Sequence, residues 1–174
     1  MGALQPQNQL AAFLPLLIEM ENIKLTSHSP EQTQELGKRI GRLARSGDVI
    51  LLVGELGTGK TCLTQGIAWG LDIEEYALSP SFVIMRELYG RLPLYHIDLY
   101  RLEAIEESID LGLDDYLYGR GICVVEWAEK AMSILPREYL LIEISYISDT
   151  GRSFVIKPNG QRYRELAEKL GDIH

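Results

Sequence analysis

Short apolar runs, separated by polar stretches, recur along the 174 residues of this chain. The run from Val49 to Val53 (VILLV) contains no polar residue, which is typical of a parallel strand buried on both faces. Ser148 to Gly151 supplies turn-forming residues, and Ser153 to Ile156 resumes an extended pattern, so a hairpin is predicted there. The other strand candidates are Ile23 to Thr26, Phe82 to Leu88, Leu94 to Leu99, Ile122 to Trp127 and Tyr139 to Ile147.

Apolar residues at helical spacing predict the elements between these strands. The segment SPEQ at 29–32 has the form of a capping box with proline at the first helical position, and its helix is predicted to end at Gly47. A second helix is predicted to begin at Thr61 and to stop at Gly70. Two further helical patterns are Ala104 to Leu111 and the residues Tyr163, Leu166, Ala167 and Leu170.

Mixed strands and helices of this kind predict an α/β fold with three layers and a mostly parallel central sheet, followed by a C-terminal antiparallel hairpin. The length of 174 residues suits one domain with a single substantial core. We assign residues 23–174 to that domain. Residues 1–22 show no clean period and are expected to be a weakly ordered extension.

Charge limits the partners that this chain can bind directly. The formal net charge is -8 at pH 7. Binding to phosphodiester backbones depends on clustered Lys and Arg side chains, so a broad nucleic-acid surface is disfavoured. Any role with RNA is therefore expected to run through a partner protein.

The sequence predicts neither a membrane span nor a disulfide. The apolar run from Leu10 to Ile18 is short and broken by Pro15, and no Lys or Arg precedes Lys24, which also disfavours a signal peptide. Cys62 and Cys123 are interpreted as small apolar side chains in a reducing compartment. A cytoplasmic location is expected.

Residues 54–61 read GELGTGKT and match the phosphate-binding pattern GxxxxGK followed by Ser or Thr. The glycines allow successive backbone N–H groups to point at phosphate oxygens, and Lys60 adds a mobile positive charge. Thr61 opens a helix whose N-terminus favours anions, and its hydroxyl is a suitable ligand for Mg²⁺. The apolar run before the loop and the helix after it supply the context that this motif requires. The sequence therefore predicts a nucleotide phosphate site.

Two acidic residues follow predicted strands and are candidates for this site. Asp98 ends the apolar run LYHI, and Glu126 ends the run ICVV. In open α/β sheets ligands bind at the carboxyl ends of the strands, so both carboxylates are expected near the phosphates. One such acid helps to hold magnesium and another can orient or activate the attacking water. The alternative is that either acid only caps a helix or pairs with a surface arginine.

Three further residues accompany these acids. By strand alternation His96, Asp98 and Tyr100 are expected on one face, near the nucleotide. A lone histidine is more often a packing residue than a catalyst, so that alternative stays open for His96. Trp127 is either an ordinary core residue or an aromatic at the mouth of the site that contacts a partner or senses the nucleotide.

These residues together resemble the bacterial TsaE family, the ATPase of the machinery that makes threonylcarbamoyladenosine on tRNA. The resemblance covers the chain from about Ser27 to its end. It rests on these motifs: GELGTGKT at 54–61, SPSF at 79–82, HIDLYRL at 96–102, LGLDDYL at 111–117 and VEW at 125–127.

The resemblance implies specific roles. Thr61 and Glu126 would bind Mg²⁺, Asp98 would be a catalytic or switch carboxylate, and Lys60 would act on the phosphates together with the rest of the loop. Arg152, at the hairpin tip, matches a family arginine that reaches toward the nucleotide. The residues expected to wrap the phosphates of ATP are Gly57, Thr58, Gly59, Lys60, Thr61 and Cys62.

Other positions are implied to act in switching and partner coupling. They are Ser79, Pro80, Ser81, Phe82, His96, Tyr100 and Trp127. Three residues depart from the usual family pattern. Ser81 replaces threonine but keeps its hydroxyl, Thr58 replaces alanine, and Cys62 replaces threonine and so loses an oxygen that could touch the α-phosphate.

The function implied by the resemblance is that of an ATP-hydrolysing accessory subunit that docks on the TsaD and TsaB proteins and resets their complex between rounds of tRNA modification. It would meet tRNA only indirectly. Two alternatives stay open from the residues alone. One is a small-molecule phosphate-loop kinase, although no segment clearly indicates an acceptor pocket or an arginine-bearing lid. The other is a nucleotide-sensing interaction module without turnover.

Overall fold

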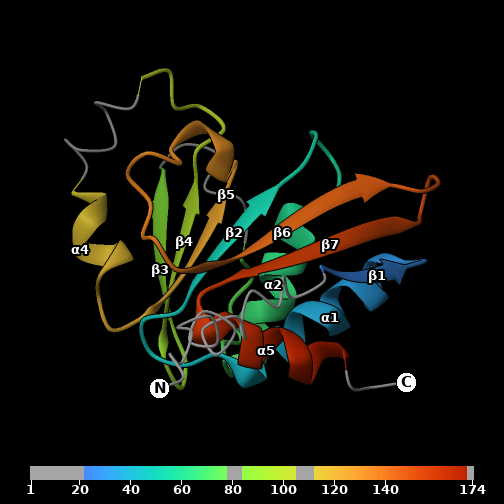
Figure 1. Ribbon diagram of the computed structural model, residues 1–174, viewed down its shortest axis with the longest axis horizontal. Helices are drawn as coiled ribbons and strands as arrows, with labels where there is room; N and C mark the ends of the chain where they lie inside the picture. Colours follow the sequence, from blue (N-terminus) through green and yellow to red (C-terminus); the bar gives the residue numbers. More distant parts are fainter. Residues whose placement is uncertain (1–21, 78–83, 105–111, 172–174) are drawn as a thin grey trace, which may run out of the picture.

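Seven β-strands form one sheet, and helices lie on both of its faces (Figure 1). This arrangement is that of a computed structural model, which describes residues 22–77, 84–104 and 112–171. The strands are β1 (Ile23–Ser27), β2 (Val49–Val53), β3 (Met85–Tyr89), β4 (Pro93–Asp98), β5 (Ile122–Glu126), β6 (Tyr139–Tyr146) and β7 (Arg152–Asn159). The helices are α1 (Pro30–Leu43), α2 (Lys60–Gly70), α4 (Leu113–Leu117) and α5 (Gln161–Gly171), with a short 3-10 helix, η2, at Ala128–Lys130.

The strand order across the sheet is β1-β7-β6-β2-β5-β4-β3. The central strands β6, β2, β5 and β4 are parallel to one another. Strands β7 and β1 extend one side antiparallel, and β3 pairs antiparallel with β4 at the other edge. The predicted α/β class, with a parallel centre and a C-terminal hairpin of β6 and β7, is confirmed.

Alternation along the strands divides the buried side chains between two apolar cores. Ile50 and Val124 belong to the core that α1, α2 and α5 cover, and Figure 1 shows these three helices together on one side of the sheet. Leu51 and Val125 belong to the opposite core, which α4 and η2 help to cover. Strands β2 and β5 are apolar throughout their central residues because both faces are buried.

Helix α1 begins as the sequence predicts. Ser29 is the N-cap, and its hydroxyl accepts a hydrogen bond from the backbone N–H of Gln32 at 3.3 Å. The Gln32 side chain accepts in turn from the backbone N–H of His28 at 2.7 Å. Pro30 occupies the first helical position, where no backbone donor is needed.

The end of α1 was predicted at Gly47, which is wrong by four residues, because the last helical residue is Leu43. The backbone N–H of Arg45 donates to the Asp48 carboxylate at 2.8 Å, and the backbone N–H of Asp48 donates to the Arg45 carbonyl at 3.0 Å. These bonds form a tight turn in place of another helical turn. Gly47 lies in it with a φ of 87°, which glycine adopts without strain.

Other differences concern short or undescribed segments. Helix α4 was missed by the periodicity, because its five residues bury only Leu113 and Leu117. Strand β3 begins at Met85, and the start predicted for it at Phe82 lies outside the described residues. The predicted helix at 104–111 and the extension at 1–22 also lie almost wholly outside them. Among the helices of the described part of the chain, none is long and apolar enough to cross a membrane.

Helices α1 and α2 approach so closely that glycine is required where they meet. A Cβ atom on Gly66 would lie 2.1 Å from the carbonyl oxygen of Gln34. Added Cβ atoms on Gly37, Gly41 and Gly70 would each meet backbone oxygen of the facing helix at 2.3 Å. No side chain can give way at these points. Helix α2, which begins at the phosphate loop, is therefore held rigidly on α1.

We expect Gly66→Ala to lower the free energy of unfolding by about 1–3 kcal/mol or more, because the added methyl group overpacks this contact. Denaturant unfolding measures the change. The matched control is Gly171→Ala at the end of α5, where the nearest atom to an added Cβ is 3.5 Å away. The control should change stability by no more than about 0.5 kcal/mol. Equal stability of the two variants would contradict the close approach of α1 and α2.

Candidate functional site

The parallel strands bring the predicted site residues to one edge of the sheet. Asp98 and Glu126 are the last residues of β4 and β5 and are direct partners in the register. Leu52, near the end of β2, pairs with Glu126 on its other side. A cavity of about 280 Å³ opens at this edge. It is lined by Leu56, Gly57, Gly59, Lys60, Thr61, Cys62, Asp98, Tyr100, Glu126 and Trp127.

The phosphate loop has the backbone that its glycines predict. Gly57 and Gly59 have φ values of 79° and 101°, in the left-handed region that favours glycine. Gly54 is needed for a different reason, since a Cβ there would lie 2.4 Å from the carbonyl oxygen of Ile144. Thr58 closes the loop through its hydroxyl, which donates to the Glu55 carbonyl at 2.8 Å.

Lys60 is folded back over its own loop. Its ammonium donates to the carbonyl of Gly54 at 2.5 Å and to that of Glu55 at 2.9 Å, and it lies 3.9 Å from the centre of the Trp127 ring. Burial lowers the pKa of Lys60, and the nearby carboxylates, Glu126 foremost, oppose this shift. The ammonium touches dipoles and a π-face rather than a carboxylate, so a phosphate oxygen would give it a stronger partner.

Glu126 is the most connected side chain of the site. One carboxylate oxygen, Oε2, accepts from the Thr61 hydroxyl at 2.9 Å. The other, Oε1, accepts from the Thr64 hydroxyl at 3.0 Å and lies 2.7 Å from His96 Nε2. The hydroxyl and carboxylate predicted to hold Mg²⁺ are thus in direct contact.

This oxygen pair fits magnesium. Mg²⁺ prefers oxygen ligands, and at nucleotide sites it takes one or two from the protein and the rest from phosphates and water. Within residues 22–77, 84–104 and 112–171, no three His, Cys, Asp or Glu side chains gather as a metal cage. Thr61 and Glu126 would accordingly hold the ion together with the phosphates rather than alone.

Asp98, Tyr100 and Trp127 line the cavity together with the loop glycines. Strand β4 ends at Asp98, so the alternation predicted to reach Tyr100 is wrong, and a turn brings Tyr100 to the cavity instead. The Asp98 carboxylate accepts from the backbone N–H of Tyr100 at 2.9 Å. The rings of Tyr100 and Trp127 lie 5.0 Å apart. Trp127 packs against the core that α4 and η2 help to cover, and it also lines the cavity. It is therefore both a core residue and an aromatic at the site, the two alternatives considered for it.

His96 is buried, so it cannot contact a partner protein directly. Its side chain is 0% exposed and does not line the cavity. It shares a face of β4 with Asp98 but points at Glu126 instead of at the space above the loop. Any influence of His96 on a ligand therefore passes through Glu126.

Arg152 braces the phosphate loop from the hairpin of β6 and β7. Its Nε donates to the Thr58 carbonyl at 3.0 Å, and its guanidinium lies 4.5 Å from the centre of the Tyr146 ring. Tyr146, which the sequence did not single out, donates its hydroxyl hydrogen to the Leu56 carbonyl at 2.7 Å. Arg152 is outside the residues that line the cavity, so its predicted contact with nucleotide stays a prediction.

Neither cysteine is in a disulfide, and Cys123 is buried as predicted, whereas Cys62 is partly exposed. Cys62 lines the cavity, and its thiol donates to the Pro30 carbonyl at 3.5 Å. Burial and the Glu31 carboxylate raise the pKa of Cys62, and burial raises the pKa of Cys123 to about 12. Both are therefore thiols at neutral pH. The predicted switch residues at 79–82 lie outside the described residues.

Thr64 is a site residue that the sequence reasoning missed. It is fully buried, and its hydroxyl lies 3.0 Å from both the Lys60 carbonyl and Glu126 Oε1. A signal for it existed. Thr64 follows Thr61 by three residues on α2, and that spacing places both hydroxyls on one side of the helix.

Comparison with known proteins decides the family. The family described as threonylcarbamoyl adenosine biosynthesis protein TsaE matches residues 27–154. The chain belongs to the TsaE family. This family takes part in tRNA threonylcarbamoyladenosine biosynthesis, and the resemblance on which the site prediction depends is confirmed.

The TsaE relatives cover most of this chain. The tRNA threonylcarbamoyladenosine biosynthesis protein TsaE of Bacillus subtilis is 44% identical over 152 residues, which are 87% of this chain and 95% of that protein. The protein of the same name from Treponema pallidum is 39% identical over 134 residues, or 77% of this chain and 99% of that one. The crystal structure of Bacillus subtilis YdiB has a TM-score of 0.76 at 40% identity and covers 86% of this chain and 94% of that chain.

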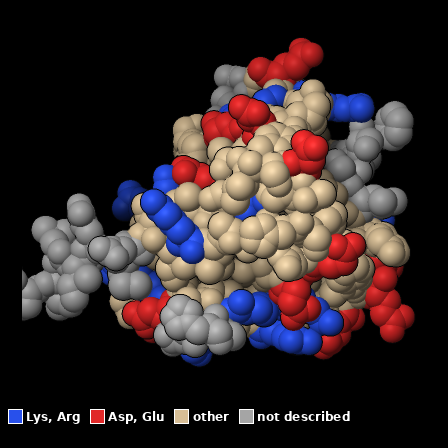
Figure 2. Space-filling view, turned by 90° about the vertical axis from the view of Figure 1, so that its right-hand side faces the viewer, with Lys and Arg blue, Asp and Glu red and all other residues tan. Residues whose placement is uncertain are grey.

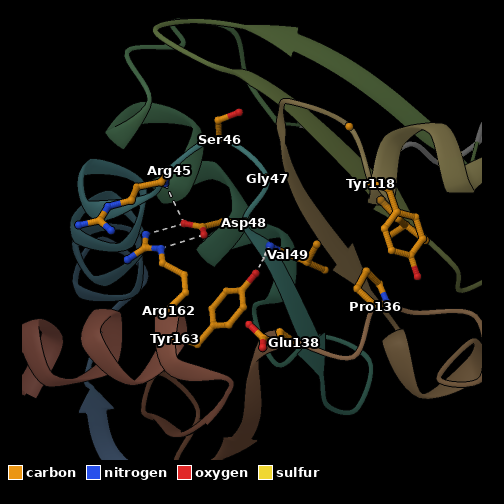
Figure 3. Close-up of a pocket in the computed structure, with 12 residues that line it drawn as sticks. Arg45, Ser46, Gly47, Asp48, Val49, Tyr118, Pro136, Glu138, Arg162 and Tyr163 are labelled. Atoms are coloured by element: carbon orange, nitrogen blue, oxygen red, sulfur yellow. Dashed lines mark hydrogen bonds and ion pairs between the residues drawn. The ribbon is translucent and has the colours of Figure 1, made fainter.

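This TsaE-family chain has a second cavity, of about 390 Å³, at the amino end of β2 (Figure 3). There the Arg162 guanidinium forms two bonds to the Asp48 carboxylate, at 3.0 and 2.6 Å. Tyr163 accepts a hydrogen bond from the backbone N–H of Val49 at 2.7 Å, and burial raises the pKa of Tyr163 to about 12. Arg162 and Tyr163 of α5 thus bind Asp48 and Val49 here, so we interpret this cavity as the anchor of α5.

We expect Tyr163→Phe to lower the free energy of unfolding by about 1–3 kcal/mol, because the buried N–H of Val49 would lose its acceptor. Denaturant unfolding measures the loss. Tyr118→Phe is the matched control, since Tyr118 lines the same cavity but is 68% exposed. Nucleotide affinity should be unchanged in both variants. A Tyr163→Phe protein as stable as the control would show that α5 is held by other contacts.

Proposed function

We propose that this protein binds ATP with Mg²⁺ at the carboxyl edge of the sheet and hydrolyses it as an accessory subunit of the tRNA threonylcarbamoyladenosine machinery. The observation that carries the proposal is the contact of the Thr61 hydroxyl with Glu126, 2.9 Å apart, beside Lys60 in the same cavity. An anion-binding loop, a mobile cation and an oxygen pair for magnesium meet there. We also propose a cytoplasmic location, in keeping with a role on tRNA.

The loop and Lys60 bind and orient the phosphates. The N-terminus of α2 and the glycine backbone present N–H groups to the phosphate oxygens. Lys60 exchanges the carbonyls of Gly54 and Glu55 for a phosphate oxygen, which is a stronger acceptor. When Lys60 binds phosphate, its ammonium leaves the Trp127 ring. Nucleotide binding thereby changes the surface that Trp127 and Tyr100 form.

The two acids divide the work. Thr61 and Glu126 hold magnesium, which when bound neutralises negative charge that develops on the phosphates. Glu126 is 2% exposed and accepts from three side chains, so we assign its carboxylate to the cation rather than to the attacking water. Asp98 is half-buried and lines the cavity, and its carboxylate is therefore the group that orients the attacking water and accepts its proton.

Partner proteins, rather than this chain, are proposed to contact tRNA. Basic and acidic side chains surround a broad uncharged area on the face shown in Figure 2, and the chain as a whole carries a net charge of -8. The apolar side chains of Leu56, Tyr100, Tyr146 and Ile147 are between 48% and 68% exposed, and the first three lie at the phosphate loop or its cavity. These exposed apolar side chains suit contact with a protein partner. We propose that the partner is TsaD with TsaB, and that each round of hydrolysis resets their complex.

We expect Lys60→Ala to weaken ATP binding by at least about tenfold, since one charge-assisted bond to phosphate accounts for roughly 1.5–3 kcal/mol. Isothermal titration with a non-hydrolysable ATP analogue measures the affinity. Lys157→Ala is the control, because Lys157 forms a partly exposed ion pair with Glu143 on β6 and β7. Similar affinity in both variants would argue against a phosphate site at this loop.

Separate effects are expected for the two acids. Asp98→Asn should retain Mg²⁺-dependent ATP binding and lower the rate of phosphate release by about 10²–10⁴-fold, as for the loss of a general base. Glu126→Gln should lose the Mg²⁺ dependence of binding itself. Glu143→Gln, at the distant ion pair, is the control. Near-normal turnover in both site variants would remove these acids from the site.

Phosphate release with and without TsaD and TsaB tests the whole proposal against its alternatives. The proposal expects release that the partners stimulate, together with tRNA modification that depends on this protein. Transfer of phosphate to an added hydroxyl metabolite would instead indicate a kinase. Tight ATP binding without release under any condition would indicate a nucleotide-sensing module.

A further inference from the structure

His96 is a polar side chain in a place where the fold alone favours an apolar one. It lies in β4, pairs with Arg86 of β3 and Val124 of β5, and is 0% exposed. Burying a polar ring in this way costs free energy unless its hydrogen bonds are satisfied. A leucine of similar volume would fill the position without that cost.

In the described part of the chain, the ring of His96 has one hydrogen-bond partner. A carboxylate is only an acceptor, so the 2.7 Å contact with Glu126 Oε1 places the hydrogen on Nε2. The other ring nitrogen, Nδ1, has no hydrogen-bond partner and is alone in this among the buried side-chain N and O atoms of the described residues. Within the described residues, the only hydrogen-bond partner of the His96 ring is therefore Glu126.

The two oxygens of Glu126 face different surroundings. Oε1 meets His96 and Thr64, both fully buried and outside the lining of the cavity. Oε2 meets the Thr61 hydroxyl, which does line the cavity. The His96 ring N–H and the Thr64 hydroxyl, which also lies 3.0 Å from the Lys60 carbonyl, both contact the inner oxygen. These contacts favour the orientation in which the outer oxygen lies on the side of Thr61.

We propose that His96 is a positioning residue that, together with Thr64, fixes the Glu126 carboxylate so that Oε2 is presented to Mg²⁺ at the nucleotide site. This rests on the proposed function, in which Thr61 and Glu126 hold the ion. Outer hydrogen bonds to metal ligands fix their orientation, and losing one typically lowers metal affinity by about 10–100-fold. His96 thus acts on magnesium without touching it.

The test compares three variants by binding, without turnover. His96→Leu removes the donor and keeps the volume, His96→Gln returns an amide N–H near the position of Nε2, and Thr64→Val removes the second donor to Oε1. The affinity for a non-hydrolysable ATP analogue is measured first in EDTA, without free Mg²⁺, and then at increasing Mg²⁺ concentrations. Binding in EDTA reports an intact phosphate loop.

The proposal expects His96→Leu and Thr64→Val to bind the analogue normally in EDTA and to need about 10–100-fold more Mg²⁺ for the same gain in affinity. His96→Gln should recover part of the loss. Parental Mg²⁺ dependence in His96→Leu, or an equal loss in His96→Gln, would overturn the proposal. If His96→Leu does not fold, Thr64→Val is the deciding variant. Parental Mg²⁺ dependence of analogue binding in Thr64→Val would then overturn the proposal.

These outcomes are distinct from a failure of the proposed function. If the parent protein binds the analogue equally well with EDTA and with Mg²⁺, the magnesium site itself is wrong. If the parent shows Mg²⁺ dependence and the variants share it, only the positioning role of His96 is wrong.

Discussion

A carboxylate that is 2% exposed, as in Glu126, is tolerated inside a sheet only when hydrogen bonds replace the water that it has lost. Here three side chains replace it, from the phosphate-loop helix and from the neighbouring strand β4. The parallel pairing of β5 with β2 and β4 makes this possible, because it brings the ends of all three strands to one edge. The protein's own side chains thus hold the carboxylate in place, which is the preorganisation that the proposed magnesium site needs.

The elements around this carboxylate keep the loop in place from two sides. Helix α1 holds α2 through glycine contacts that allow no sliding, since an added Cβ on either helix would meet backbone. The hairpin of β6 and β7 supports the loop from the other side, where Arg152 and Tyr146 bind the carbonyls of Thr58 and Leu56. The Lys60 ammonium donates to the carbonyls of Gly54 and Glu55 and lies on the Trp127 ring, which contacts the ring of Tyr100. In the proposed function, Lys60, Trp127 and Tyr100 are the groups that respond to nucleotide.

Local signals in the sequence predicted much of this structure. The motif at 54–61 is preceded by an apolar run and followed by a helical pattern, which together predict the strand, loop and helix. The apolar runs before Asp98 and Glu126 predict parallel strands, whose carboxyl ends meet at the edge of the sheet where the loop lies. The contact of Glu126 with His96 could not be predicted in this way, because it depends on strand register. The bond from Val49 to Tyr163 joins residues 114 positions apart and carries no local signal. Tyr100 lines the cavity as predicted, but the alternation from which its place was derived does not hold, because β4 ends at Asp98.

The most direct test of the account is a crystal structure with Mg²⁺ and a non-hydrolysable ATP analogue. The account predicts phosphate oxygens against the amides of residues 57–62, with Lys60 moved from the carbonyls of Gly54 and Glu55 to a phosphate. It also predicts Mg²⁺ bound by the Thr61 hydroxyl and by the Glu126 carboxylate, directly or through water. An analogue bound elsewhere, or a cation that Glu126 does not contact, would contradict it.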